Sequence, residues 1–382
     1  MDIRLIDRAD TLDEVSRGLA GVRRVALDCE AAGFHRYSDR LCLVQLTAGN
    51  RTFVLDPLSV EVAPVLGPLL EDPDREIVMH GSDFDLRLLD RDLDIQIQGL
   101  FDTQAAATIL GINGIGLQSL LGRTLDVKLA KKYQRADWAR RPLPQPMIDY
   151  AALDTIHLME LADRLTSELQ DVGRMAWAVE EFRALEEIRY EEPEESDPTV
   201  RVKASRDLSD REVHRLREAL NWRDEVAQEM DRAPFRVAND SVLVEVARRN
   251  PGSMEDLVDI QGLNGRLARG EGDALLERLR RVDAFGNDEV KGLPEREYDG
   301  RGRPPPEEEE RMRRLKAARN QKAKEMGIDR GSLLPNALLE ELAAAPPTTL
   351  EDIRSVEGIR NWQAEVLGPD LLKALEAVPT GG

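Results

Sequence analysis

The second half of the chain contains one pattern twice, at a constant offset of 96 residues. Four residue types recur at this offset, in the pairs Met230 and Met326, Pro251 and Pro347, Asp256 and Asp352, and Gly262 and Gly358. An offset that is held without gaps indicates duplication of one folding unit. The apolar spacing within each copy predicts a small helical bundle with a long first helix, a glycine-containing turn and a short last helix.

The first half has a different pattern. From residue 22 to residue 110, strand-like and helix-like segments alternate, which is typical of an α/β fold. The runs LCLVQLT and TFVLD are separated only by residues 48–51, and this spacing favours an antiparallel hairpin within a mixed sheet. Residues 103–190 are predicted to be mainly helical.

Two segments lack apolar periodicity and are rich in charge, proline and glycine. They are residues 191–205 and residues 286–310, and both are predicted to be linkers. The domain prediction is therefore an α/β domain over 1–190 and two helical domains over 206–285 and 311–377.

Composition sets the classes of function that the chain supports. Its net charge is -20, so it lacks the overall basic character of many nucleic-acid-binding proteins, although a local basic stripe or bound divalent cations would supply positive charge. Cys29 and Cys42 lie in apolar runs and predict reduced thiols in a cytoplasmic protein. No export signal, membrane span, ATP-binding P-loop or zinc-ligand spacing is predicted from the sequence.

Two acids stand at the end of a predicted strand in the sequence VALDCE. Asp28 and Glu30 are two apart and share one face of the strand, while Val25, Leu27 and Cys29 share the other. Two neighbouring carboxylates repel each other unless cations join them, and Mg²⁺ and Mn²⁺ prefer oxygen ligands of this kind. The alternative is a solvated strand end.

Further acids occur near helix starts. In DYAALDT, Tyr150 and Asp154 lie one helical turn apart, which suits either a site or a half-buried tyrosine beside a surface acid. In HGSDFD, Asp85 has the spacing of a capping box with Ser82, and Asp83 is a competing candidate in the same turn. We interpret two other acids as structural: Asp102 as a helix N-cap and Asp56 as a turn residue.

Two basic segments stand out in the acidic chain. Between residues 126 and 142, six basic residues face two acids, a net charge of 6 − 2 = +4: Lys128, Lys131, Lys132, Arg135, Arg140 and Arg141 against Asp126 and Asp137. Phosphate contact is one use, with Tyr133 or Trp138 available for stacking; the other is a solvated face with Trp138 in the core. Residues 311–324 contain seven basic residues and no acid, and they fit either phosphate contact or a solvated helix face.

Taken in order, DCE, then His80 and Asp85 as H-x4-D, then Tyr150 and Asp154 as Y-x3-D resemble the three motifs of the DEDDy 3′→5′ exonucleases. The stretches LCLVQLT, FDTQAAA and QRADWARRPL look like the ribonuclease D family, and the paired repeats resemble its HRDC domains. The sequence AAG follows DCE where bulkier residues often follow in the family, so the resemblance does not define the pocket for the terminal nucleotide.

The resemblance implies an RNase H-like exonuclease domain followed by two all-α HRDC-like bundles. It makes Asp28, Glu30, Asp85 and Asp154 the ligands of two divalent metal ions, Mg²⁺ or Mn²⁺. Tyr150 becomes the residue that positions the attacking water, and His80 fixes the register that selects Asp85 over Asp83.

The expected substrate is RNA with a free 3′ end, such as a tRNA precursor, and the protein is expected to act as a monomer without ATP. The residues expected to contact the nucleic acid are His80, Lys128, Lys131, Lys132, Gln134, Arg135, Trp138 and Arg140. The alternatives are a single-stranded DNA 3′→5′ exonuclease and a non-catalytic nucleic-acid-binding scaffold.

Overall fold

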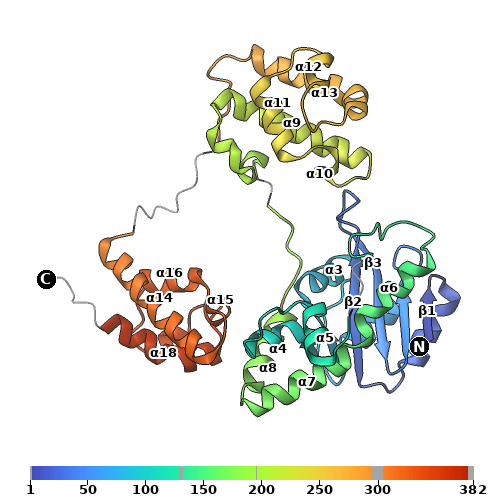
Figure 1. Ribbon diagram of the computed structural model, residues 1–382, viewed down its shortest axis with the longest axis vertical. Helices are drawn as coiled ribbons and strands as arrows, with labels where there is room; N and C mark the ends of the chain where they lie inside the picture. The colour runs from blue at the N-terminus through green and yellow to red at the C-terminus, as the bar shows by residue number, and fades with distance from the viewer. Residues whose placement is uncertain (1, 129–131, 195, 295–303, 377–382) are drawn as a thin grey trace.

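The computed structural model describes residues 2–128, 132–194, 196–294 and 304–376. These residues form one α/β domain and two helical domains (Figure 1). None of the described helices combines the length and the apolar character that crossing a membrane requires.

The α/β domain is built on a six-stranded mixed sheet with the strand order β1-β4-β3-β2-β5-β6. The strands are β1 (Asp2–Ile6), β2 (Arg24–Ala31), β3 (Leu41–Ala48), β4 (Arg51–Leu55), β5 (Glu76–Met79) and β6 (Leu100–Asp102). Strand β3 pairs antiparallel with both β2 and β4, whereas β1–β4, β2–β5 and β5–β6 pair in parallel. The expected hairpin of LCLVQLT and TFVLD is confirmed as β3 and β4.

Helices cover both faces of this sheet (Figure 1). After the short 3-10 helix η1 (Ala9–Thr11), they are α1 (Leu12–Gly18), α2 (Ala63–Leu70), α3 (Asp83–Leu93), α4 (Thr103–Ile109), α5 (Leu117–Leu125), α6 (Gln145–Ile156), α7 (Leu158–Asp171) and α8 (Met175–Glu186). Val25, Leu27 and Cys29 of β2 are buried in one core with side chains of α1, α2 and α3. Asp28 and Glu30 therefore project from the opposite face, as the alternation in β2 predicts.

Two helical domains follow. The first contains α9 (Asp210–Glu229), α10 (Pro234–Val237), α11 (Asp240–Arg249), α12 (Met254–Val258) and α13 (Gly265–Ala284). The second contains α14 (Pro306–Met326), α15 (Arg330–Leu333), α16 (Asn336–Ala344), α17 (Leu350–Arg354) and α18 (Asn361–Glu376).

The duplication is visible in backbone conformation. Gly262 and Gly358 have φ angles of 91° and 87°, and Ser253 and Thr349 cap the N-termini of α12 and α17 at the same offset. A left-handed backbone strongly favours glycine, which accounts for the repeated turn glycine. The expected short last helix is wrong: α13 has 20 residues and α18 has 16, because apolar residues continue along each helix into the bundle core.

The segments expected to be linkers are partly structured. Two 3-10 helices, η2 (Pro198–Arg201) and η3 (Lys203–Asp207), precede α9, and Val202 is buried in the core of the first helical domain. In the second segment, α14 already begins at Pro306, and residues 295–303 lie outside the described part of the chain. The ordered helical domains thus extend further into these segments than the sequence predicts.

Candidate active site

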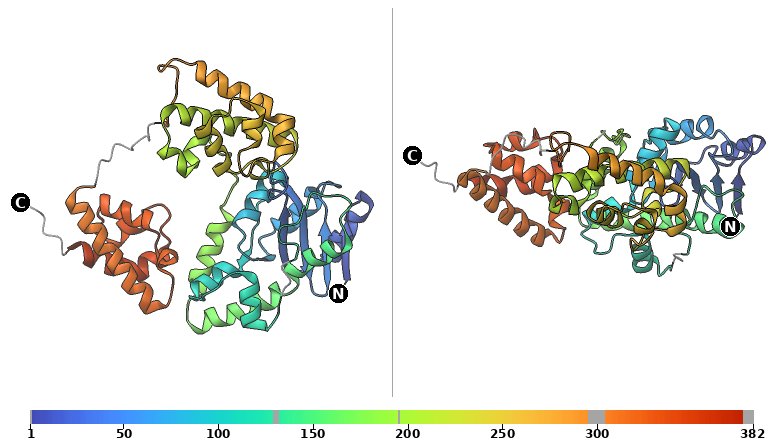
Figure 2. Two further views of the ribbon diagram at one scale, coloured as in Figure 1. Left: turned by 45° about the horizontal axis from the view of Figure 1, so that its top comes forward. Right: turned by 90° about the horizontal axis from the view of Figure 1, so that it is seen from above.

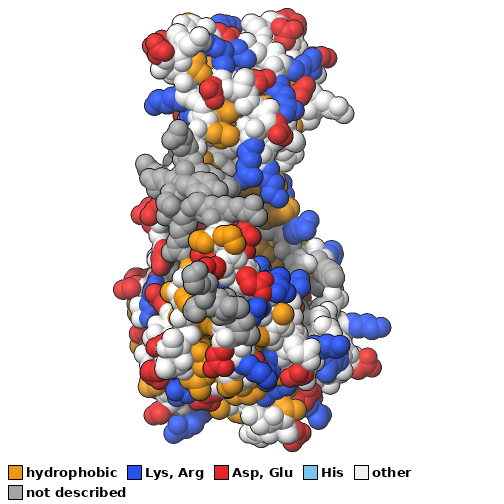
Figure 3. Space-filling view, turned by 90° about the vertical axis from the view of Figure 1, so that its left-hand side faces the viewer, with side chains coloured by type: hydrophobic (Ala, Val, Ile, Leu, Met, Phe, Trp, Pro, Cys, Tyr) orange, Lys and Arg blue, Asp and Glu red, His pale blue; other side chains and the backbone are white. Residues whose placement is uncertain are grey.

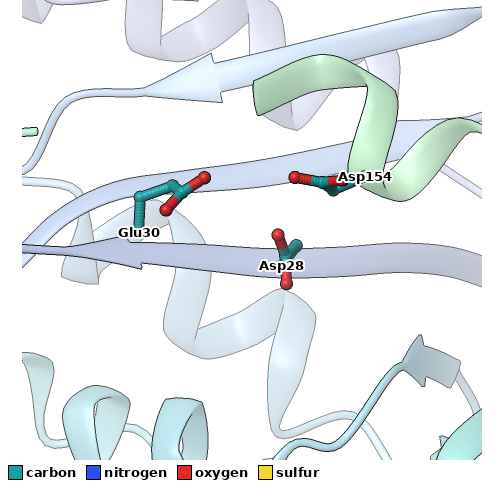
Figure 4. A group of neighbouring side chains, drawn as sticks. All are labelled: Asp28, Glu30 and Asp154. Atoms are coloured by element: carbon teal, nitrogen blue, oxygen red, sulfur yellow. The ribbon is translucent and has the colours of Figure 1, made fainter. Parts of the chain in front are cut away.

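Three carboxylates meet between β2 and α6, on the face of the strand opposite Val25, Leu27 and Cys29. Asp28 and Glu30 come from the strand, and Asp154 comes from α6, which crosses above it (Figure 4). One carboxylate oxygen from each residue lies within 4.8 Å of those of the other two. Carboxylate oxygens at this separation are suited to share a hard divalent cation.

Small side chains let α6 approach the sheet closely. Ala151 and Ala152 are both 0% exposed, and the Thr155 and Thr47 hydroxyls are hydrogen-bonded with their oxygens 2.6 Å apart. This contact joins α6 to β3 one residue beyond Asp154. This hydrogen bond therefore fixes the position of α6 on the sheet at the point where Asp154 faces β2.

The structure distinguishes Asp85 from its neighbour Asp83. Asp83 is exposed and forms an ion pair with Arg87 at 3.1 Å. The charge of Asp85 raises the pKa of Asp28 and of Glu30, although Asp85 is not among the three acids whose oxygens lie within 4.8 Å of one another. The capping-box alternative does not form, since within the described residues the Ser82 hydroxyl has no hydrogen-bond partner.

Asp102 holds the turn that precedes Asp85. Its carboxylate accepts hydrogen bonds from the Gln104 and Ala105 amides at the start of α4, which confirms its N-cap assignment. It also accepts hydrogen bonds from the amides of Gly81 and Ser82, at 3.2 and 2.7 Å. Asp102 therefore connects the end of β6 to the β5–α3 turn, directly before the first turn of α3, which carries Asp85.

Burial raises the pKa of every acid in the site, and the charges of neighbouring acids raise those of Asp28 and Glu30 further. Burial, followed by the charges of Asp85, Glu30 and Asp154, raises the pKa of Asp28 well above its ordinary value. Burial raises the pKa of Asp154 to about 6, and burial followed by the charge of Asp102 raises that of Asp85 to about 8. Full ionisation of the cluster near neutral pH thus requires positive charge, which divalent cations provide.

Tyr150 lies beside the cluster, one turn before Asp154 on α6. Burial, then the charges of Asp154, Glu30 and Asp28, raises the pKa of its phenol to about 12. Its ring packs edge-on against Tyr133, with the ring centroids 5.6 Å apart. The phenol is therefore held in place and stays protonated, so it can orient a water molecule by hydrogen bonding but does not act as an anionic base.

His80 also borders the site. Its Nδ1 lies 2.9 Å from the Thr103 hydroxyl oxygen, and that hydroxyl donates its proton to the Met79 carbonyl at 3.0 Å. Nδ1 must then donate to Thr103, and because burial lowers the pKa of the ring, Nε2 is left as an acceptor. Nε2 is thus available to accept a hydrogen bond from a hydroxyl group in the site.

These side chains border a cavity of about 390 Å³, which is lined by Asp28, Glu30, His80, Gly116, Leu117, Gln118, Ser119, Gln134, Tyr150 and Asp154. Residues 116–119 at the start of α5 were missed by the sequence reasoning. The glycine-rich run GINGIG directly before a helix was the signal that could have found them, because such a turn lets backbone approach a ligand closely.

Most of the residues of the basic segment that were expected to contact nucleic acid are accessible. Lys128, Lys132, Gln134, Arg135 and Arg140 are exposed, and Gln134 reaches the cavity. Lys131 lies outside the described residues. The interpretation of this segment as a phosphate-binding surface stays a prediction.

The prediction that Trp138 contacts the nucleic acid is wrong. Its side chain is 2% exposed and packs in a core with Met147, Ile148 and other apolar residues, so the indole cannot stack on a nucleotide. The apolar surroundings outweigh the position of this tryptophan in a basic segment.

Arg141 of the same segment is a structural residue. Its guanidinium binds the carboxylate of Asp56, which is 2% exposed, at 2.5 and 2.6 Å, and the carbonyl of Cys42 at 3.0 Å. Asp56 also bonds the turn at Leu58 and Ser59, in agreement with its assignment as a turn residue. Arg141 is thus committed to the fold and does not contribute a free charge to the surface.

Several basic side chains of helix α14 already have partners within the protein. Arg319 is 3% exposed and donates to the Leu334 carbonyl, and Arg313 and Arg314 both pair with Glu310. Figure 3 shows the side of the molecule that carries this domain, where Lys and Arg side chains are interspersed with Asp and Glu. The solvated-face alternative describes this helix better than a phosphate-binding one.

The fold and the acidic cluster together define a 3′→5′ exonuclease joined to two HRDC domains. The 3'-5' exonuclease family matches residues 3–170, and the HRDC domain matches residues 213–279 and 308–375. Ribonuclease D from Pseudomonas paraeruginosa is 31% identical over 360 residues, which cover 92% of each chain. The chain belongs to the ribonuclease D family and is therefore a 3′→5′ exoribonuclease.

Two further comparisons agree with this assignment. Escherichia coli RNase D, an exoribonuclease involved in structured RNA processing, is 25% identical in sequence to this chain. Its crystal structure matches with a TM-score of 0.69, and the match covers 100% of both chains. The Exosome complex component 10 homolog of Drosophila melanogaster is 28% identical over 265 residues. The match covers 67% of this chain and only 29% of that longer protein.

Proposed function

We propose that this chain removes nucleotides one at a time from the 3′ end of structured RNA precursors, tRNA precursors among them, using two divalent cations. The observation that carries the proposal is the convergence of Asp28, Glu30 and Asp154 within 4.8 Å at the edge of the cavity. The description of the Escherichia coli relative supports structured RNA as the substrate class.

Asp28, Glu30, Asp85 and Asp154 would hold the cations. The burial of all four acids and the repulsion that the others exert on Asp28 and Glu30 fit this role, because buried acids are stable in the ionised form only beside compensating charge. Bound cations offset the negative charge of the scissile phosphate and promote ionisation of water. Mg²⁺ and Mn²⁺ both suit an all-oxygen site of this kind.

The remaining side chains orient the reactants. The attacking water forms a new P–O bond while the bond from phosphorus to the 3′ oxygen breaks, and that oxygen ends as a hydroxyl. Tyr150 would hydrogen-bond to the attacking water, and the Nε2 atom of His80 would accept a hydrogen bond from a ribose hydroxyl of the terminal nucleotide. A ribose 2′-hydroxyl is present in RNA and absent from DNA, so the latter contact would favour RNA.

The test is degradation of a 5′-labelled RNA by the full-length chain with Mg²⁺ or Mn²⁺ and with EDTA. A ladder of products shortened from the 3′ end, abolished by EDTA and by Asp28→Asn, is expected. Degradation that continues in EDTA or in Asp28→Asn would contradict the assignment. A DNA oligonucleotide of the same sequence tests the alternative substrate, and faster degradation of the DNA would favour that alternative.

A further inference from the structure

A pair of exposed aromatic rings spans the boundary between the exonuclease domain and the first HRDC domain. Phe34 lies in the loop between β2 and β3 and is 38% exposed, and Phe235 lies in α10 and is 45% exposed. Their ring centroids are 5.4 Å apart and their planes are inclined by 56°. Exposed phenylalanines are costly in water, so two in contact at a domain boundary indicate a binding surface.

The rings have fixed positions because the two domains are hydrogen-bonded beside them. The Arg236 Nε donates to the Phe34 carbonyl at 2.8 Å, and the Ala233 amide donates to the His35 carbonyl at 3.1 Å. The Tyr37 hydroxyl donates to Asp224 of α9 at 2.8 Å. The β2–β3 loop, which follows the strand of Asp28 and Glu30, is thus hydrogen-bonded to the first HRDC domain. Figure 2 shows this domain next to the sheet.

Positive charge surrounds the two rings. The guanidiniums of Arg236 and Arg135 lie 4.9 and 5.4 Å from the Phe34 ring centroid. The neighbouring Arg36 is neutralised by ion pairs with two aspartates, whereas no described acid forms an ion pair with Arg135 or Arg236. A cleft of about 470 Å³ lies next to these residues and is lined by Arg36, Arg232 and Arg236 together with Asp137 and Asp231.

The surface adjoins the active-site cavity. Gln134 lines that cavity, and Arg135, the next residue, lies over Phe34 and has its carbonyl 2.9 Å from Nε2 of His35. Phe34 itself follows Glu30 by four residues. An RNA strand whose 3′ end lies in the cavity can therefore pass Gln134 and Arg135 and reach the aromatic pair.

We propose that Phe34 and Phe235, with Arg135 and Arg236, form a stacking subsite for single-stranded RNA upstream of the nucleotide being removed. This inference rests on the proposed function. Aromatic faces stack on any base and arginines bind the backbone phosphates, so the subsite tolerates all sequences and suits an enzyme that shortens its substrate stepwise. It exists only when the two domains are joined, which gives the first HRDC domain a direct role in substrate binding.

The experiment compares Phe235→Ala with Phe235→Trp in the full-length chain. Binding of a 5′-fluorescein 12-nucleotide RNA is measured by anisotropy in an Asp28→Asn background, and hydrolysis of the 12-mer and of a dinucleotide is measured in the active background with Mn²⁺. We expect Phe235→Ala to weaken 12-mer binding by about tenfold and to raise its KM, while Phe235→Trp binds like the parent. Hydrolysis of the dinucleotide, which has one upstream nucleotide, should change least.

A second pair of variants tests the contribution of the arginine charges. Arg236→Ala should weaken 12-mer binding and reduce the salt dependence by about one counterion, whereas Arg248→Ala, which removes an exposed charge from α11 of the same domain, should change neither. Equal losses for the two variants would overturn the assignment of Arg236 to the subsite.

Other outcomes separate the subsite from the activity. If the unaltered chain degrades RNA and Phe235→Ala binds the 12-mer as tightly as the parent, the subsite is wrong and the proposed function stands. If Phe235→Ala slows the dinucleotide and the 12-mer equally, the substitution acts through the fold and the subsite is also wrong. If the unaltered chain degrades no RNA with Mn²⁺, the proposed function fails, and the binding arm still decides the subsite.

Discussion

Trp177 of the exonuclease domain and Trp362 of the second HRDC domain stack with their ring centroids 5.1 Å apart and their planes inclined by 16°. Polar contacts surround the pair: Glu180 accepts hydrogen bonds from the Asn361 and Trp362 amides, and Glu181 accepts one from the Trp362 indole at 2.8 Å. A carboxylate of one domain thus caps the first turn of α18 in the other, where the helix dipole favours negative charge.

Replacement of Trp177 should release the second HRDC domain. Trp177→Ala is expected to cost about 0.5–1.5 kcal/mol of docking energy beyond the lost buried area, because it removes the ring stack. Small-angle X-ray scattering should show a larger radius of gyration. Trp177→Phe, which keeps an aromatic ring, should retain most of the compactness, and an unchanged radius in Trp177→Ala would show that the stack does not hold the domain.

Removal of the Asp85 charge should stabilise the metal-free protein at alkaline pH. The pKa of Asp85, about 8 in the folded protein, lies above its ordinary value of 3.8, so the folded state binds this proton more tightly than the unfolded state. Asp85 therefore contributes its full stabilisation of the folded state below about pH 4, and this contribution is lost as the pH rises through about 8. In EDTA, Asp85→Asn should therefore melt at a higher temperature than the parent at pH 8.5, with a smaller gain at pH 5.

A neighbouring acid provides the control for this measurement. Asp83→Asn, which alters the exposed partner of Arg87, should show no such pH-dependent gain. Addition of Mn²⁺ at pH 8.5 should stabilise the parent more than Asp85→Asn. A melting temperature of metal-free Asp85→Asn below that of the parent at pH 8.5 would show that the charge of Asp85 is compensated within the protein itself.

Local rules predicted the parts of the site that depend on short spacing. Alternation along β2 placed Asp28 and Glu30 on one face, and the helical turn placed Tyr150 beside Asp154. The choice of Asp85 over Asp83 came from the resemblance, since the two acids lie in the same turn, the first turn of α3. The physical reason for this choice is visible only in the structure, where Asp102 fixes the turn before Asp85 and Asp83 pairs with Arg87.

Features that depend on contacts between distant segments were not predictable. Trp138 and Arg141 lie in a basic run, yet one is buried by α6 and the other pairs with Asp56, 85 positions earlier. The same holds for the contact between Phe34 and Phe235, which are far apart in the sequence. Charge counted along a segment does not reveal which charges the fold already neutralises.

Loss of Arg141 should destabilise the fold although it removes a residue from a basic segment. Arg141→Ala would leave Asp56 buried without its partner, and such uncompensated acids cost about 3–5 kcal/mol. Arg140→Ala removes the same charge from an exposed neighbour and should leave the free energy of unfolding within about 0.5 kcal/mol of the parent. Urea unfolding of both variants measures the difference, and equal stabilities would contradict a structural role for Arg141.

The Tyr150 hydroxyl should affect turnover more than substrate binding. Tyr150→Phe keeps the ring that packs against Tyr133 and removes only the group proposed to orient water, so kcat should fall by about 10²-fold with little change in KM. Because the phenol stays protonated up to a pKa of about 12, the pH profile of the residual activity should keep the shape seen in the parent below pH 10. Tyr133→Phe removes a hydroxyl from the adjoining ring and should retain near-parental kcat. A loss confined to KM in Tyr150→Phe would instead make Tyr150 a substrate-binding residue.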